Sequence, residues 1–179
     1  MARLNFALSS SIGIVVVLAL VARSAPFLPN KARLDDEVRS LADVSSVRLA
    51  VQQHCKELVD EGFDASAAEA LVEKQLDHAA INVVEEDTAP MLKIEIYGST
   101  EPNVPSALAF LVSLKLVQPV TIDRLDEKML VPTFTMVRGG MEASDRVRST
   151  AEAELAAVVD TFLVRCQAAT RESRQRESQ

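Results

Sequence analysis

Large apolar residues occupy every second position between Ala107 and Val117, and this alternation constrains the fold more than any other feature of the sequence. The positions are Leu108, Phe110, Val112, Leu114 and Leu116. Successive side chains of a β-strand point to opposite faces of a sheet, so the pattern predicts a strand with one apolar face. That face must be covered, and the fold therefore needs a second layer packed on the sheet.

Two segments of the sequence can supply that second layer. Residues 144–170 contain no Gly or Pro and repeat apolar residues at helical spacing, which predicts a long helix with one buried stripe. The stripe consists of Val147, Ala151, Leu155, Val158, Phe162 and Cys166. Residues 65–78 also lack Gly and Pro, and Asp64 is a suitable N-cap for a helix there.

Shorter apolar alternations and β-branched residues predict the remaining strands, at residues 47–52, 81–84, 92–97 and 129–137, with a continuation of the central strand through residues 120–122. Pro132 indicates an edge position or a bulge in the last strand, and Gly139 and Gly140 are expected to terminate it. This grouping predicts an α+β fold, in which two helices pack on one face of a mainly antiparallel sheet of about four strands.

An unbroken apolar run at residues 12–22 lies near the N-terminus, after Arg3. Its eleven residues fit the apolar region of a signal peptide, which spans about 7–15 residues, and fall short of the roughly 20 that a membrane-spanning helix needs. Small residues at Ala22 and Ser24 suit cleavage just before Ala25. We expect residues 1–25 to be a signal peptide or, alternatively, an N-terminal hydrophobic helix that anchors the protein through residues 6–22.

The rest of the chain divides into three parts by composition. Residues 26–43 contain two prolines and a charge cluster and are expected to be a linker, with one possible helical turn. Residues 44–170 are expected to form a single α+β domain. Residues 171–179 are polar throughout and are expected to be a disordered tail.

The charge and cysteine content exclude several classes of function. Acidic residues outnumber basic ones 26 to 19, which gives a net charge of −7 and disfavours a nucleic-acid partner. After loss of residues 1–25 the surplus would grow, so contact with a membrane is expected only through the N-terminal segment. Two cysteines are too few for a disulfide-rich scaffold or a multi-cysteine zinc site.

The candidate reactive residues are few and scattered. His54 and Cys55 are adjacent, so in a strand they would point to opposite faces, and His78 is distant in sequence. We expect these residues to be structural, and we assign no catalytic, cofactor-binding or metal-binding residue and no cofactor. Cys55 and Cys166 are expected to be free thiols, with a disulfide between them as the alternative in an oxidising compartment. The acidic clusters at residues 35–37 and 85–87 lack the ligand spacing of a calcium loop and are expected to be solvated.

Several short motifs together resemble a group of small exported bacterial proteins of unknown function with a β-α-β-β-β-α layout. The residues that carry the resemblance are Val47–Val51, Gly62–Asp64, Ala79–Ile81, Gly139–Gly140 and Val158–Phe162. The chain departs from the group at Ala80, where Gly is usual, and at Val137 and Arg138, where an aromatic residue is usual. The resemblance implies an exported location and a fold similar to small envelope-assembly modules, and it implies no catalytic or binding residue.

These observations favour a non-catalytic domain of the bacterial cell envelope that acts through protein–protein contact, because sheets of this kind can recruit partners at an exposed edge. One alternative is a carrier of a small apolar ligand between the sheet and the helices. The other is a small hydrolase or metal-dependent enzyme that uses His54, Cys55 or His78.

Overall fold

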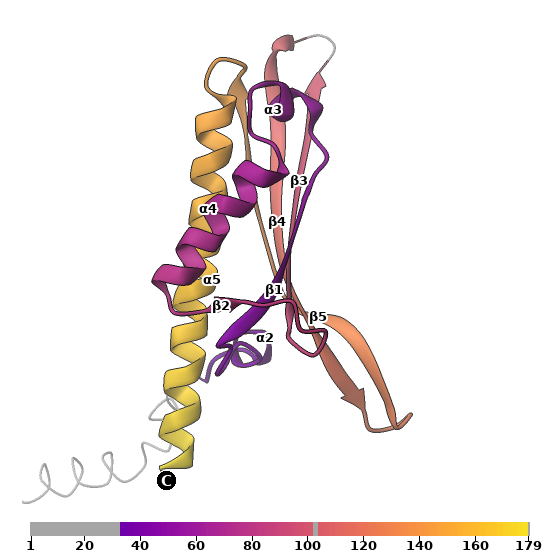
Figure 1. Ribbon diagram of the computed structural model, residues 1–179, viewed down its shortest axis with the longest axis vertical. Coiled ribbons are helices and arrows are strands. Elements are labelled where there is room, and N and C mark those ends of the chain that lie inside the picture. The colour runs from indigo at the N-terminus through magenta and orange to yellow at the C-terminus, as the bar shows by residue number, and fades with distance from the viewer. Residues whose placement is uncertain (1–32, 102–103, 179) are drawn as a thin grey trace, which may run out of the picture. The chain divides into compact units, whose positions relative to one another are not determined.

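The structure is a computed structural model that describes residues 33–101 and 104–178, and the part from Leu34 onward forms one compact unit (Figure 1). Its elements, in order, are α2 (Asp36–Arg39), β1 (Ser46–Gln53), α3 (Lys56–Asp60), α4 (Ala65–His78), β2 (Asn82–Val83), β3 (Met91–Glu101), β4 (Val104–Ile122), β5 (Glu127–Ala143) and α5 (Val147–Glu177). The predicted N-terminal hydrophobic segment lies outside the described residues. Among those residues, no helix combines the length and apolarity required to cross a membrane.

The sheet differs from the prediction in strand number and direction. It has five strands in the order β2-β1-β3-β4-β5, and β1 runs parallel to both β2 and β3. Only the β3–β4 and β4–β5 pairs are antiparallel. The expectation of about four mainly antiparallel strands was therefore wrong, because a strand that is followed by a helical crossover returns parallel to its neighbour, as β1 does through α3 and α4.

The predicted core is confirmed. All five apolar residues of the alternating row in β4 are buried, and Phe110 is the most exposed of them at 5 %. All six residues of the predicted stripe on α5 are buried too. Phe162 lies against Phe134 of β5, with their ring centroids 5.9 Å apart, so α5 packs on the apolar face of the β4–β5 pair. α4 lies beside α5 on the same face (Figure 1).

α4 begins and ends where the sequence predicted. The Asp64 side chain accepts a hydrogen bond of 2.8 Å from the backbone N–H of Ala67 and so caps the first turn. At the other end, Ile81 N–H donates to Leu76 O and Ala80 N–H to Asp77 O, which closes the helix with Ala80 in the left-handed conformation at φ +57°. An alanine at this position is strained, because its Cβ crowds the backbone in a way that glycine avoids.

β5 does not end at the glycine pair. Gly139 and Gly140 lie inside the strand, which continues to Ala143 and pairs with β4 throughout. A Cβ at Gly139 would come within 2.3 Å of Phe110 O, so this glycine permits a close approach of two backbones rather than a turn. β4 is also longer than predicted, starting at Val104 and continuing without a break to Ile122.

The two ends of the domain also differ from the prediction. Residues 34–43, predicted as part of a linker, pack on the domain, and Leu41 is completely buried. α5 continues past Thr170 to Glu177 rather than giving way to a disordered tail. Glu172 in this last part accepts a hydrogen bond of 3.2 Å from the backbone N–H of Leu34, so the extended helix contacts the start of the domain.

Candidate interaction surface

The residues weighed as an enzyme site are placed apart by the fold. The Cys55 thiol is buried beside Gly98, where it occupies the space a Cβ would need, and burial raises its pKa. His54 lies on the opposite face of the sheet, stacked on Tyr97 at 4.9 Å. His78 is at the far end of α4, which is about 20 Å long, and its Nδ1 lies 2.6 Å from Lys74 O.

The remaining candidates have local structural partners. Cys166 is buried in the stripe of α5, which raises its pKa to about 12, and both cysteines are free thiols as expected. From the acidic clusters, Glu37 binds the backbone of β5 and Asp87 pairs with Arg48. No group of three potential metal ligands occurs within residues 33–101 and 104–178.

The sheet face that α4 and α5 leave uncovered holds a buried carboxylate. Glu95 of β3 is only 7 % exposed and lies between Lys93 at 2.8 Å and Lys115 at 2.6 Å. Hydrogen bonds from Lys115 and then Lys93 lower the pKa of Glu95 to about 2. The two lysines stand directly opposite each other on β3 and β4, so Glu95 neutralises a like-charge pair that would destabilise the sheet.

Beyond Glu95, the uncovered face is apolar toward the C-terminal end of β5. Four exposed side chains from three neighbouring strands gather there: Tyr97, Leu111, Val137 and Met141. Met141 is the most exposed of them, at 69 %. Single exposed apolar residues are ordinary on a protein surface, whereas a contiguous group is typical of an interaction site.

At its other end the sheet narrows to two strands. β3 begins opposite Val117, so residues 118–132 of β4 and β5 extend past it as a two-stranded β-arm that projects away from α5 (Figure 1). No residue of the β-arm is buried. Its largest exposed apolar side chains are Leu125 at 49 %, Met129 at 46 % and Leu130 at 64 %.

The base of the β-arm is held by the segment around α2. Gln118 Nε2 donates to Ser40 O at 3.1 Å, and the Ser40 hydroxyl, which donates to Glu37 O at 2.7 Å, also lies 3.3 Å from Thr133 O. Thr135 N–H donates to Glu37 Oε1 at 2.8 Å. These bonds fix the direction of the arm at its root while the rest of it projects into solvent. An isolated two-stranded hairpin is only marginally stable in water, so this arm depends on its root and on whatever it contacts.

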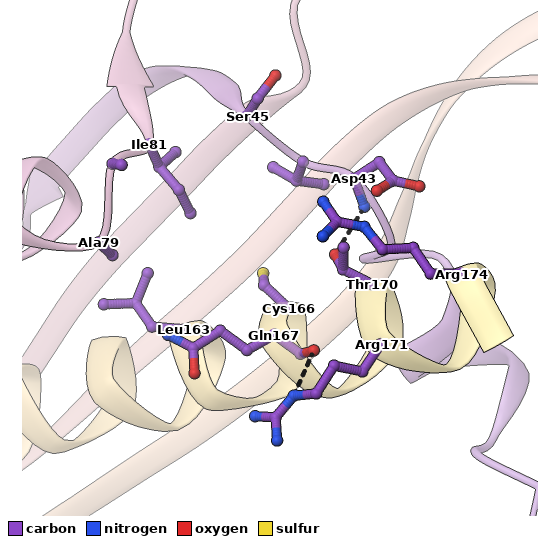
Figure 2. A pocket seen from close by; sticks show the side chains of 12 residues that line it. Asp43, Ser45, Ala79, Ile81, Leu163, Cys166, Gln167, Thr170, Arg171 and Arg174 are labelled. Carbon is purple, nitrogen blue, oxygen red and sulfur yellow. Dashed lines mark hydrogen bonds between the residues drawn. The ribbon is translucent and has the colours of Figure 1, made fainter.

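A pocket of about 610 Å³ lies between the C-terminal part of α5 and the loops after α2 and α4 (Figure 2). Its lining includes the apolar side chains of Ile81, Leu163 and Cys166 and the charged side chains of Asp43, Arg171 and Arg174. Figure 2 shows a hydrogen bond of 3.0 Å from Asp43 N–H to the Thr170 hydroxyl at one side of the pocket. The lining therefore combines apolar side chains with two basic ones and one acidic one.

The β-arm, the pocket and the apolar end of the uncovered face were not expected from the sequence. The sequence signals that could have indicated the arm were Pro119 and Pro132, because prolines within strands occur at sheet edges or bulges. Pro119 lies within the arm and Pro132 at its end. What the sequence does not display is where β3 begins relative to β4, and β4 and β5 form the arm because they extend past that point.

Comparisons with known proteins find similar structures but no matching family. No family model matches the chain, and no curated protein matches it. A PelC dodecamer from Paraburkholderia phytofirmans, which carries a single substitution, is similar at 10 % identity and a TM-score of 0.42, over 67 % of this chain and 86 % of that one. A minor lipoprotein from Acinetobacter baumannii is similar at 11 % identity and a TM-score of 0.38, over 72 % and 95 %.

A proposed lipoprotein from Caulobacter crescentus CB15 is similar at 12 % identity and a TM-score of 0.35, over 77 % of this chain and 96 % of that one. These three structures come from bacteria, and two of them are described as lipoproteins. Since the TM-scores lie below 0.5, the function is inferred from the chain's own residues.

Proposed function

We propose that this protein is a non-catalytic domain of the bacterial cell envelope that works by binding another protein. The observation that carries the proposal is the β-arm, residues 118–132, which exposes large apolar side chains and has no buried residue. An apolar arm in water gains free energy when a partner covers it, because removal of apolar surface from water is favourable. The arm is therefore the part of the molecule best suited to protein–protein contact.

The envelope location is supported by the sequence of the N-terminal segment. The apolar run at residues 12–22 and the small residues before Ala25 favour export, whether the segment is then removed or kept as an anchor. Cell fractionation followed by N-terminal sequencing tests this step. A mature N-terminus at Ala25 means a cleaved signal, an intact Met1 in the membrane fraction means an anchor, and intact chain in the cytoplasmic fraction would contradict export.

Site-specific photo-crosslinking in living cells tests the contact. A photoreactive amino acid is placed at Leu130 of the arm and, in a matched control, at Val164 on the outer side of α5. The two side chains are equally exposed, at 64 % and 62 %, so non-specific collisions should label them equally. We expect a discrete protein adduct at Leu130 and none at Val164. Absence of an adduct at Leu130, or the same adduct at both positions, would contradict the proposal.

A second candidate function, the carriage of a small ligand, is favoured by the pocket in Figure 2. The apolar side chains of the lining suit a hydrocarbon body, and Arg174 suits an anionic head group. A fatty acid such as dodecanoate is the appropriate probe, with dodecylamine as its oppositely charged control. Binding of dodecanoate that weakens in Arg174→Glu would support carriage, and equal binding of both probes, or of neither, would contradict it.

A further inference from the structure

The outer edge of β5 carries backbone groups that point away from the sheet. In an antiparallel pair, alternate residues direct their N–H and C=O groups toward the neighbouring strand and away from it. Thr135 N–H donates to Glu37 rather than to β4, which identifies the outward set. With an unbroken register from Phe134 to Ala143, that set consists of Thr135, Val137, Gly139, Met141 and Ala143.

The two ends of this outward set are capped by carboxylates and its middle is not. Glu37 accepts from Thr135 N–H at 2.8 Å, and Glu142 accepts from Ala143 N–H at 3.1 Å. Between the caps, no hydrogen bond within the described part of the chain reaches the outward groups of the other three residues. We call residues 137–141 the edge window. All five of its residues are exposed, so neither α5 nor a loop covers it.

The edge window is symmetric about Gly139. The two capped residues, Thr135 and Ala143, each lie four positions from it, and the outward residues Val137 and Met141 each lie two positions from it. We propose that a second copy of this chain pairs with the edge window, β5 against β5, antiparallel about a two-fold axis at Gly139. This arrangement uses every free outward group of the edge window and gives the self-complementary interface that two-fold dimers require. The same register places Thr135 opposite Ala143 of the partner subunit, so the pairing ends at the Glu37 and Glu142 carboxylates that cap these two residues.

The side chains fit the same arrangement. On the uncovered face, Val137 would lie opposite Met141 of the partner subunit, and these are two of the most exposed apolar residues of the described chain, at 51 % and 69 %. On the helix-covered face, Arg138 is paired with Glu154 at 2.5 Å, so the two Arg138 side chains near the axis are each neutralised within their own chain. Exposed strand edges are templates for such pairing unless they are blocked, and β5 is blocked only beside the window.

This inference goes beyond the proposed function, because it concerns contact between copies of the chain and not contact through the β-arm. Its test is disulfide crosslinking of the full chain in envelope membranes with a mild oxidant. The proposed register places residue 137 directly opposite residue 141 of the other copy, at about 5.5 Å between Cα atoms, which a disulfide can span. Residue 137 of one copy lies about 13 Å from residue 137 of the other, and the same holds for residue 141. A disulfide cannot span that distance.

The expected result follows from this register. The double variant Val137→Cys/Met141→Cys should form a covalent dimer, and so should a mixture of the two single variants. Either single variant alone should stay monomeric on the gel, as should the exposed control Val164→Cys. The native cysteines add little background because both are buried.

Several outcomes would overturn the inference. Failure of the double variant to crosslink would exclude the pairing. Equal crosslinking of the single variants would indicate a different register or parallel strands, and crosslinking of Val164→Cys to the same extent would indicate random collision. A negative result here leaves the photo-adduct at Leu130 unaffected, so the failure of this inference and the failure of the proposed function are distinguishable.

Discussion

The body of the sheet and the β-arm are built from the same two strands, β4 and β5, and yet they differ completely in burial. In the body, every second residue of β4 is buried on the face of the sheet that α5 contacts. In the arm, past Val117, no residue is buried, and the segment around α2 contacts only its root. The body thus buries its apolar surface within the chain, whereas the arm leaves Leu125, Met129 and Leu130 in solvent.

This difference shows that folding stability and contact with other molecules depend on different parts of the same two strands. The body carries the free energy of folding, because its apolar face is removed from water by the chain's own helices. The arm contributes little to folding and offers its apolar side chains to another molecule. Substitutions in the body and in the arm test that separation through the free energy of unfolding.

The largest effect is expected in the body at Phe162. This side chain is completely buried and packs against Phe134, so Phe162→Ala should leave a cavity between α5 and the sheet. The free energy of unfolding should fall by about 3–5 kcal/mol, the usual range for truncation of a buried Phe. Denaturant unfolding measures this change. A change under about 1 kcal/mol would mean that α5 does not dock on the sheet through this face.

A smaller effect is expected at Glu95. Glu95→Gln removes the carboxylate that separates Lys93 from Lys115 and should lower the free energy of unfolding by about 1–2 kcal/mol, a range reduced because both lysines are partly exposed. The pKa of Glu95 is lowered from 4.5 to about 2 in the folded protein. Its contribution should therefore be present above about pH 4.5 and be lost as the pH falls toward about 2.

Unfolding curves between about pH 6 and about pH 2 provide the check on the Glu95 prediction. The difference in stability between wild type and Glu95→Gln should shrink steadily over the lower half of this range. A difference that stays constant with pH would show that the carboxylate charge is not what stabilises this face of the sheet.

A stabilising change is expected at Ala80. This residue closes α4 in the left-handed conformation, which costs an L-residue roughly 1–2 kcal/mol, and glycine adopts it without that cost. Part of the gain is offset by the greater freedom of glycine in the unfolded chain, so Ala80→Gly should raise the free energy of unfolding by about 0.5–1 kcal/mol. Ala79→Gly, at the preceding position with negative φ, is the matched control and should destabilise. A destabilised Ala80→Gly would show that its backbone is not strained.

The smallest effect on stability is expected in the β-arm. Leu130→Ser should change the free energy of unfolding by no more than about 0.5 kcal/mol, because the Leu130 side chain is exposed and buries little. The same variant should nevertheless lose the contact detected by crosslinking from Met129. A large loss of stability would mean that the arm belongs to the core, and an unchanged adduct would mean that Leu130 takes no part in the contact.

Much of the fold could be predicted from periodicity, and the sites could not. The α4 bounds, the β4 row and the α5 stripe follow from local patterns, since the sequence period records which face is buried. The parallel direction of β1 depends on the helical crossover that follows it, and that crossover relates segments that are distant in the sequence. The glycine pair was misread because Gly139 serves a close backbone approach rather than a turn. The β-arm and the edge window depend on where neighbouring strands end and which backbone groups are already capped, and no local pattern contains that information.

The most direct test of the separation between body and arm is a chain in which residues 119–130 are replaced by Asn-Gly, a dipeptide that favours a tight hairpin turn. Its thermal unfolding is compared with wild type, and each chain, in excess, is used to compete with the photo-adduct formed at Leu130 of a labelled chain. We predict that the arm-less chain unfolds cooperatively within a few degrees of wild type and does not compete, whereas the intact chain does. An unfolded arm-less chain, or one that competes as well as wild type, would contradict the account.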